Sequence, residues 1–194
     1  MENDETRSAS ESLKLIEGMI NKAQNRFSEN GTLYLLWGWT IFFCALAQYI
    51  SLKYAVFANA SLVWLSVIVV MIYQVFYLTK KGKTEKVKTY TDEIIGYVWM
   101  TFGICMGLLS FIMGKLNVWI LFYPFIFLFY GVPTFLSGAI MRFKPLQIGG
   151  ICCWALSIIA LFITTIEVIL LLIPAVLSAW IIPGYLLRAR FKSV

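Results

Sequence analysis

The sequence contains no histidine, and only 13% of its residues are charged, against about a quarter in an ordinary soluble domain. Histidine is the commonest metal ligand and a frequent general base near neutral pH, so its absence removes the simplest metal centres and acid–base sites. No charged residue lies in the middle of a long apolar stretch, where proton relays and ion pathways need one. These absences argue against proton-coupled transport and against ion conduction by charged side chains.

Cysteine is also scarce, and no cysteine falls in a predicted outer loop. The four are Cys44, Cys105, Cys152 and Cys153. A disulfide framework of the secreted kind is therefore not expected. Packing as small apolar residues is their favoured role, with metal binding or redox chemistry as the alternative.

Carboxylates near membrane depth are limited to Asp92, Glu93 and Glu167. Glu167 is predicted on the opposite side of the membrane from the other two, so they cannot form a pair for acid–base catalysis. No candidate nucleophile has a base beside it. We therefore expect that the protein is not an enzyme and that it has no catalytic residue, bound metal or cofactor.

What the sequence does contain is 60% hydrophobic residues, with a mean hydropathy of +0.81. Six apolar stretches are long enough for a helix to cross a hydrocarbon core, which takes about 20 residues. They cover residues 32–52, 56–79, 94–113, 118–141, 147–165 and 168–187. We predict an all-α, multi-pass membrane protein whose residues 31–194 form a six-helix transmembrane bundle. Its three hairpins are 32–79, 94–144 and 147–192.

Lysine and arginine are distributed unevenly along the chain. If the N-terminus is cytoplasmic, every basic residue except Lys53 and Lys115 falls in a cytoplasmic segment. Because short cytoplasmic loops retain these residues, we expect a cell-membrane protein with both termini in the cytoplasm. The net charge of +6 then reflects topology and implies no nucleic-acid partner. For the basic loop 80–88, attraction to anionic lipid is the alternative to topology alone.

The first 30 residues predict a cytoplasmic amphipathic helix. Ser8 and Glu11 fit a capping box, and the apolar residues that follow share one helical face. Those residues are Leu13, Ile16, Met19, Ile20, Ala23 and Phe27. The polar face mixes both charges, whereas helices on a lipid surface are usually rich in lysine and arginine. We expect this helix to dock against the bundle, a second copy of the chain or a partner protein.

Part of the chain reads as one helical hairpin present twice. Gly-Ile-Cys occurs at 103–105 and again at 150–152, each followed by a Leu-Ser pair at the same spacing. Pro124 and Pro133 in the first copy correspond to Pro174 and Pro183 in the second, and an Arg-Phe-Lys run follows each pair. The two copies would enter the membrane in the same sense, related by rotation about its normal. Residues 32–79 resemble them weakly, as a diverged third copy.

Small residues recur along one stripe of the third apolar stretch. They are Gly96, Gly103, Gly107, Ser110 and Gly114. In lipid, small residues let helix backbones approach closely, and this holds bundles together. We expect this helix to lie at the centre of the bundle.

The paired prolines suggest a binding site. A proline inside a helix frees a carbonyl and bends the helix, and breaks at corresponding positions in two repeats point to a transporter site. The alternative is that these prolines only pack. The candidate ligand-binding residues around the breaks are Tyr123, Tyr130, Pro133, Ser137, Ser110, Trp180 and Pro183.

Two functions follow from these patterns. The first is a non-catalytic membrane scaffold or sensor that engages lipid or a protein partner from the cytoplasmic side, alone or as a homo-oligomer. The second is a small transporter for an uncharged or apolar solute, with a site between the proline-broken helices four and six. The transporter requires a mostly apolar cavity between these helices, because freed carbonyls in a membrane need protein or water beside them.

Overall fold

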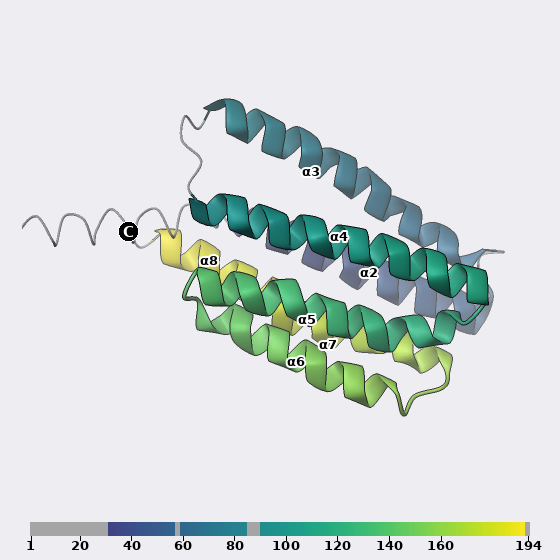
Figure 1. Ribbon diagram of the computed structural model, residues 1–194. Helices are drawn as coiled ribbons and strands as arrows, with labels where there is room; N and C mark the ends of the chain where they lie inside the picture. Colours follow the sequence, from purple (N-terminus) through teal and green to yellow (C-terminus); the bar gives the residue numbers. More distant parts are fainter. Residues whose placement is uncertain (1–30, 57–58, 85–89, 193–194) are drawn as a thin grey trace, which may run out of the picture.

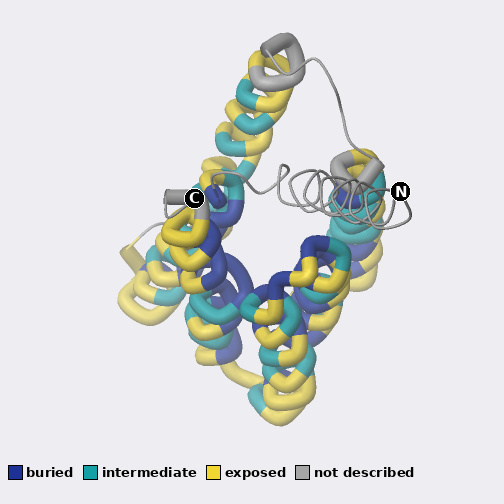
Figure 2. The backbone as a smooth tube through the Cα atoms, turned by 90° about the vertical axis from the view of Figure 1, so that its left-hand side faces the viewer, coloured by how far each residue is buried: buried dark blue, intermediate teal, exposed yellow. Residues whose placement is uncertain are grey.

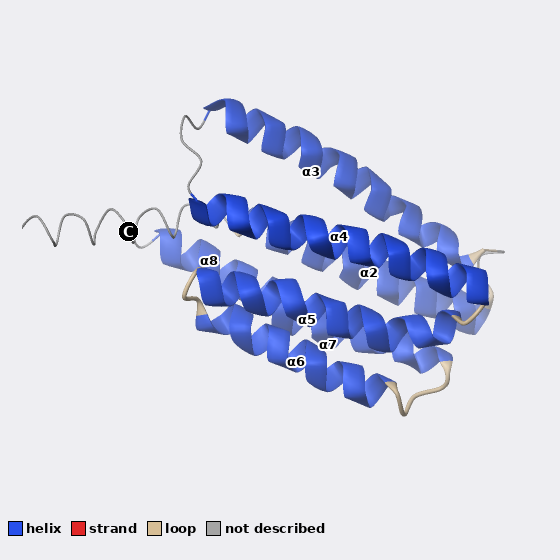
Figure 3. Ribbon diagram, viewed as in Figure 1, coloured by secondary structure: helices blue, strands red, loops and turns tan. Residues whose placement is uncertain are grey.

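The computed structural model describes residues 31–56, 59–84 and 90–192. No strand occurs in these ranges, and nearly all of the residues are helical (Figure 3). The amphipathic helix predicted for residues 1–30 lies outside them and stays a prediction.

The helices follow the predicted order (Figure 1). The first four are α2 (Thr32–Tyr54), α3 (Leu65–Thr84), α4 (Tyr90–Leu116) and α5 (Phe122–Ile140), with short 3-10 turns η1 (Ala60–Trp64) and η2 (Trp119–Leu121) leading into α3 and α5. Next comes α6 (Lys144–Ala160), and the last span is built from η3 (Ile166–Leu171), α7 (Leu172–Val176), η4 (Leu177–Ile181) and α8 (Ile182–Lys192). Among the described residues, five helices are long and apolar enough to cross a membrane, and α6 is apolar with 17 residues. This architecture is compatible with a helical membrane bundle.

Several helices end at residues in the left-handed region. Ala55 (φ 51°), Asn117 (φ 56°) and Arg142 (φ 51°) follow α2, α4 and α5, a conformation that commonly ends helices. After α5, the backbone N–H of Phe143 donates to the Gly138 carbonyl at 2.8 Å. α6 starts at once, with a proline in its first turn, where the missing N–H costs nothing. The α5–α6 connection is therefore short and closely defined.

The last span lies at the centre of the bundle, and α3 lies at its edge. Half of the most apolar window of the last span is buried, compared with 11% for α4 and none for α3. Figures 1 and 2 show α3 at the edge of the bundle, and no residue from 65 to 80 is buried. The expectation that α4 forms the centre is therefore wrong.

The small-residue stripe of α4 does not pack against another helix within the described residues. A Cβ atom added at Gly96, Gly103 or Gly107 would meet nothing within 4 Å, and one at Gly114 would meet only the Trp119 ring, at 3.2 Å. Ser110 uses its hydroxyl within α4, donating to the Met106 carbonyl. The spacing identifies one face of the helix, but spacing alone does not say what lies against that face.

Close packing occurs instead where α6 meets α5 and η4. A Cβ atom on Gly150 would lie 2.7 Å from the Phe135 Cβ, and one on Gly138 would lie 2.7 Å from the Gln147 backbone nitrogen. On the other side of α6, a Cβ atom on Gly149 would lie 2.5 Å from the Ser178 carbonyl oxygen. These glycines let three backbones approach more closely than any larger residue would allow.

The proposed duplication stays a prediction. The alignment pairs Gly103 with Gly150, and the structure gives the two glycines unlike surroundings: one faces open space and the other faces α5. The helices also differ, since α5 is α-helical throughout whereas the last span changes between three helix types.

Polar contacts join α2 to α3 and to the turn η1 that precedes it. The indole N–H of Trp37 donates to Gln74 Oε1 at 2.6 Å, and that of Trp64 donates to Gln48 Oε1 at 2.9 Å. The third contact joins Cys44 Sγ and Ser66 Oγ, 3.0 Å apart. Polar contacts between helices in a membrane are each worth about 0.6 to 2 kcal/mol.

Replacing Gln48 and Gln74 together with leucine should loosen α3 from α2, because both indole N–H groups lose their acceptors in an apolar surrounding. Spin labels at the exposed positions Phe43 and Val69 would report a broader distance distribution in the double variant. The matched control is Gln147→Leu in α6, whose side chain donates to the Gly138 carbonyl. If the double variant and the control give the same distribution, these hydrogen bonds do not fix α3.

Candidate functional site

Between α5 and η4, the predicted site is filled by aromatic rings. The rings of Tyr130 and Trp180 lie with centroids 4.8 Å apart, and both residues are buried. The Trp180 indole N–H donates to Thr134 Oγ1 at 3.2 Å. Pro133 and Pro183 are also fully buried, so both prolines are enclosed by protein.

The other predicted residues are dispersed. Ser137 is fully buried on α5, and its hydroxyl has no hydrogen-bond partner in the described chain; the same holds for the buried Tyr34 hydroxyl. Ser110 lies on α4. Tyr123 lies at the far end of α5, where its hydroxyl donates to Gln48 Oε1 at 3.5 Å.

A cluster of five aromatic side chains links four elements of the bundle. We call it the aromatic cluster: Tyr34 of α2, Trp99 and Phe102 of α4, Tyr130 of α5 and Trp180 of η4. Neighbouring ring centroids are 4.8 to 6.1 Å apart, within the range of favourable aromatic contacts. Sequence reasoning placed Tyr130 and Trp180 here as cavity walls, but it missed that rings from α2 and α4 would fill the space.

The helix breaks have local causes. Pro133 has no N–H to donate to the carbonyl of Phe129, four residues earlier in α5. In the last span, the π-helical turn η4 ends two residues before Pro183, and it carries Trp180. π-Helical turns and prolines both bend helices, and π-helical turns recur at functional sites.

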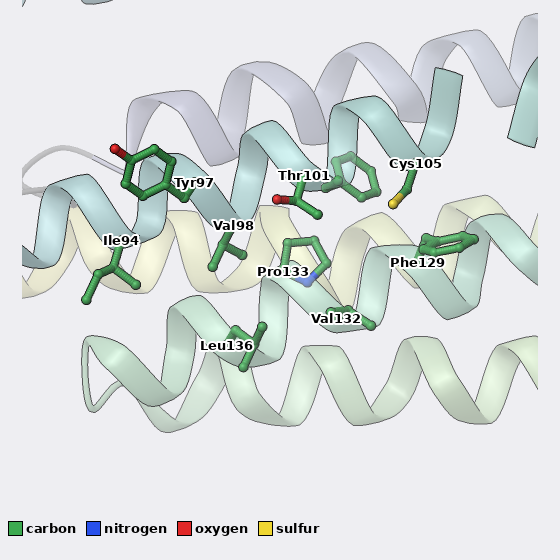
Figure 4. A pocket seen from close by; sticks show the side chains of 10 residues that line it. Ile94, Tyr97, Val98, Thr101, Cys105, Phe129, Val132, Pro133 and Leu136 are labelled. Carbon is green, nitrogen blue, oxygen red and sulfur yellow. The ribbon is translucent and has the colours of Figure 1, made fainter. Parts of the chain in front are cut away.

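A groove of about 350 Å³ lies between α4 and α5. It is lined almost entirely by apolar atoms from Ile94, Tyr97, Val98, Thr101, Phe102, Cys105, Phe129, Val132, Pro133 and Leu136. Figure 4 shows Ile94 and Tyr97 toward one end and Cys105 and Phe129 toward the other, with Pro133 between them. Of the predicted site residues, Pro133 alone lines this groove, and its partner helix is α4 rather than the last span.

The Tyr97 end of the groove is polar. The Tyr97 hydroxyl donates to Glu93 Oε1 at 3.0 Å, one helical turn nearer the start of α4. Both side chains are exposed. The groove therefore has an apolar lining, and the Tyr97 hydroxyl and Glu93 carboxylate form a polar pair beside this end of it, with Glu93 itself outside the lining.

Exposed basic side chains gather at this same end of the bundle. They are Lys80 near the end of α3, Arg142 and Lys144 between α5 and α6, and Arg188 and Arg190 of α8. The starts of α2, α4 and α6 lie at this end, as do the last turns of α3, α5 and α8 (Figure 1). At the opposite end, the described chain carries Lys53, Lys115 and Glu167. We call the first set the basic end.

No protein family, curated protein or solved structure matches this chain. Within the described ranges, no three cysteine or carboxylate side chains gather as a group able to hold a metal ion. The groove and the basic end are the two features that carry a functional argument.

Proposed function

We infer that this protein is a non-catalytic membrane scaffold or sensor that engages lipid, or a protein partner, from its cytoplasmic side. The observation that carries this proposal is the basic end, where five exposed cationic side chains of the described residues lie at one end of the bundle. Such residues attract anionic lipid headgroups by about 1 kcal/mol each near a membrane surface. They also mark the side that short loops keep in the cytoplasm.

The interior of the bundle supports the same proposal. The aromatic cluster fills the region between α5 and η4, where the alternative function, a transporter, requires a cavity. The residues there are held by ring contacts and by the Trp180–Thr134 hydrogen bond. A bundle with an aromatic-filled centre and a cluster of cations at one end favours recognition of a ligand at that end over passage of a solute through the centre.

The second candidate is transport of an uncharged or apolar solute, and the groove between α4 and α5 favours it. Its wall of apolar side chains and its volume fall in the range of small-molecule sites. The groove lies on the outer side of α5, away from the last span, so a transport path would run between α4 and α5. An uptake assay in vesicles with Thr101→Phe, which fills the groove, tests this alternative.

Neutralising the basic end tests the first proposal. We expect Arg142→Gln, Lys144→Gln and Arg188→Gln together to lower the retention of anionic lipid, or of a bound protein, by more than about tenfold. The measurement is native mass spectrometry of protein extracted gently from its own membrane. The matched control is Lys53→Gln with Lys115→Gln, which removes cations from the opposite end.

Orientation has to be checked in the same samples, because removing cytoplasmic charges can invert a membrane protein. A cysteine at Lys144 should react only from the cytoplasmic side, and one at Lys115 only from outside. Equal retention by the triple variant and the control, with this topology intact, would contradict the proposal.

A further inference from the structure

We propose that the groove between α4 and α5 binds one acyl chain of a phospholipid from the cytoplasmic leaflet, and that Glu93 and Tyr97 receive an ammonium group of its headgroup. This site deepens the proposed function, on which it rests for the choice of lipid as ligand and for orientation. It is separate from the basic end, which acts on headgroups by charge alone.

The length of the groove matches one leaflet. It follows α4 from Ile94 to Cys105, about 16 Å of helix at about 1.5 Å per residue. Half of a hydrocarbon core of about 30 Å is about 15 Å. The groove starts at the polar end of α4 and stops near mid-membrane, so a chain lying in it spans the cytoplasmic leaflet alone.

The groove opens sideways to the bilayer. Val132 and Leu136 on its α5 rim are each 41% exposed, and Tyr97 on the α4 rim is 57% exposed. An acyl chain can therefore enter from the surrounding lipid without leaving hydrocarbon. A water-soluble solute has no such route, because the apolar wall would be its first contact.

The floor of the groove is held in shape by the protein core. Phe102 lines the groove and packs against Tyr130, with ring centroids 5.6 Å apart. Pro133 lines it as well and is fully buried. Because these side chains are already held in place, binding a ligand here immobilises fewer of them and loses less conformational entropy. The exposed side chains of α3 have no such support.

The mouth selects the headgroup. The Glu93 carboxylate accepts a hydrogen bond from the Tyr97 hydroxyl. Because Glu93 is exposed, its carboxylate can also accept a hydrogen bond from an ammonium group. Hydrogen bonds between an ammonium group and a carboxylate are stronger than neutral ones. A fatty acid or a phosphatidylglycerol brings an anionic group without an ammonium group to offset it, so neither offers Glu93 a cationic hydrogen-bond donor. The complementary ligand is a phospholipid with a primary ammonium headgroup.

Photo-crosslinking tests the chain. The probe is phosphatidylethanolamine carrying a diazirine on one acyl chain, added to the full-length protein in phosphatidylcholine nanodiscs. Mass spectrometry should find crosslinks concentrated on residues 94–105 and 129–136. Val132→Trp should lower this yield by about tenfold, the effect of excluding about two methylenes, and Val69→Trp on exposed α3 should not.

Thr101→Phe, on the opposite rim, provides a second blocking variant in case Val132→Trp is poorly folded. If crosslinks fall equally on α3 and on the groove, the chain is ordinary boundary lipid and the proposal is wrong. The same holds if both blocking variants, folded by circular dichroism, keep the full groove yield.

A second probe tests the headgroup. The same diazirine chain on phosphatidylglycerol should label the groove less than the phosphatidylethanolamine probe does, and Glu93→Gln should remove this preference. A preference that survives Glu93→Gln, or one for phosphatidylglycerol, would overturn the assignment of the mouth.

The two proposals can fail separately. Blocking the groove leaves Arg142, Lys144 and Arg188 in place. Loss of groove labelling with retained dependence on these residues would sink the groove alone. Suppose instead that groove labelling persists, but that neutralising Arg142, Lys144 and Arg188 does not change the retention of anionic lipid or bound protein. That result would contradict the basic-end proposal alone.

Discussion

Gly150→Leu should destabilise the folded protein by about 3 kcal/mol or more, at the upper end of the usual cost of overpacking. A Cβ atom at this position would already lie 2.9 Å from two backbone atoms, the Gly131 carbonyl oxygen and the Phe135 nitrogen. Backbone atoms cannot move aside as the end of a flexible side chain can, so α5 and α6 would have to separate. Unfolding by denaturing detergent, followed by circular dichroism, measures the loss.

Gly103→Leu is the matched control, since both glycines follow the same Gly-Ile-Cys pattern. A Cβ atom at Gly103 meets nothing within 4 Å, and replacing a helical glycine removes a cost of about 0.5 to 1 kcal/mol. This variant should keep or slightly raise stability. A comparable loss in both variants would contradict the packing described for α6.

Trp180→Ala should cost about 3 to 5 kcal/mol, as expected for truncating a large buried aromatic residue. Trp180 is 2% exposed and contacts the rings of Tyr130 and Trp99. Its loss leaves a cavity in the aromatic cluster and an unused hydroxyl on Thr134. The same detergent titration measures this effect, with loss of near-ultraviolet circular dichroism as a second readout.

Trp119→Ala is the comparison for Trp180, because Trp119 is 53% exposed at the opposite end of the bundle. We expect a loss below about 1 kcal/mol, typical of a surface substitution. Thr134→Val should fall between the two, at about 1 to 3 kcal/mol, because it leaves a buried indole N–H without its acceptor. A Trp180→Ala cost no larger than that of Trp119→Ala would show that the cluster does not stabilise the bundle.

The course of the helices could be predicted from composition and hydropathy. The apolar stretch predicted at 32–52 is α2, Thr32–Tyr54, and the boundary between the stretches predicted at 147–165 and 168–187 falls at the connection between Ala160 and Ile166. Transfer of apolar residues into hydrocarbon is a local property of the chain, so single stretches reveal it. The shortness of α6 was less visible, because its apolar residues continue into the turn that follows it.

Packing partners could not be predicted in the same way. A small-residue stripe says which face of a helix permits close approach, but the neighbour is decided by the whole bundle. The stripe of α4 has no partner in the described chain, whereas Gly149 and Gly150 of α6 have one on each side. Side-chain volume also determines where the groove lies. Trp180 and Tyr130 fill the space beside Pro133 toward the last span, so the groove lies on the α4 side.

The unequal lengths of α4 and α6 have a consequence for the bilayer around the protein. α4 has 27 residues and is about 40 Å long, whereas α6 has 17 and is about 26 Å long. Against a core of about 30 Å, the polar first turn of α4 can extend beyond the core and its apolar part can tilt, whereas lipid that fits α6 alone would be thinner by about 4 Å, at a fraction of a kcal/mol per Å. Thinner membranes remove this cost, as does sharing the thinned lipid between two copies. Bilayer thickness is therefore a sorting variable for this protein, independent of headgroup charge.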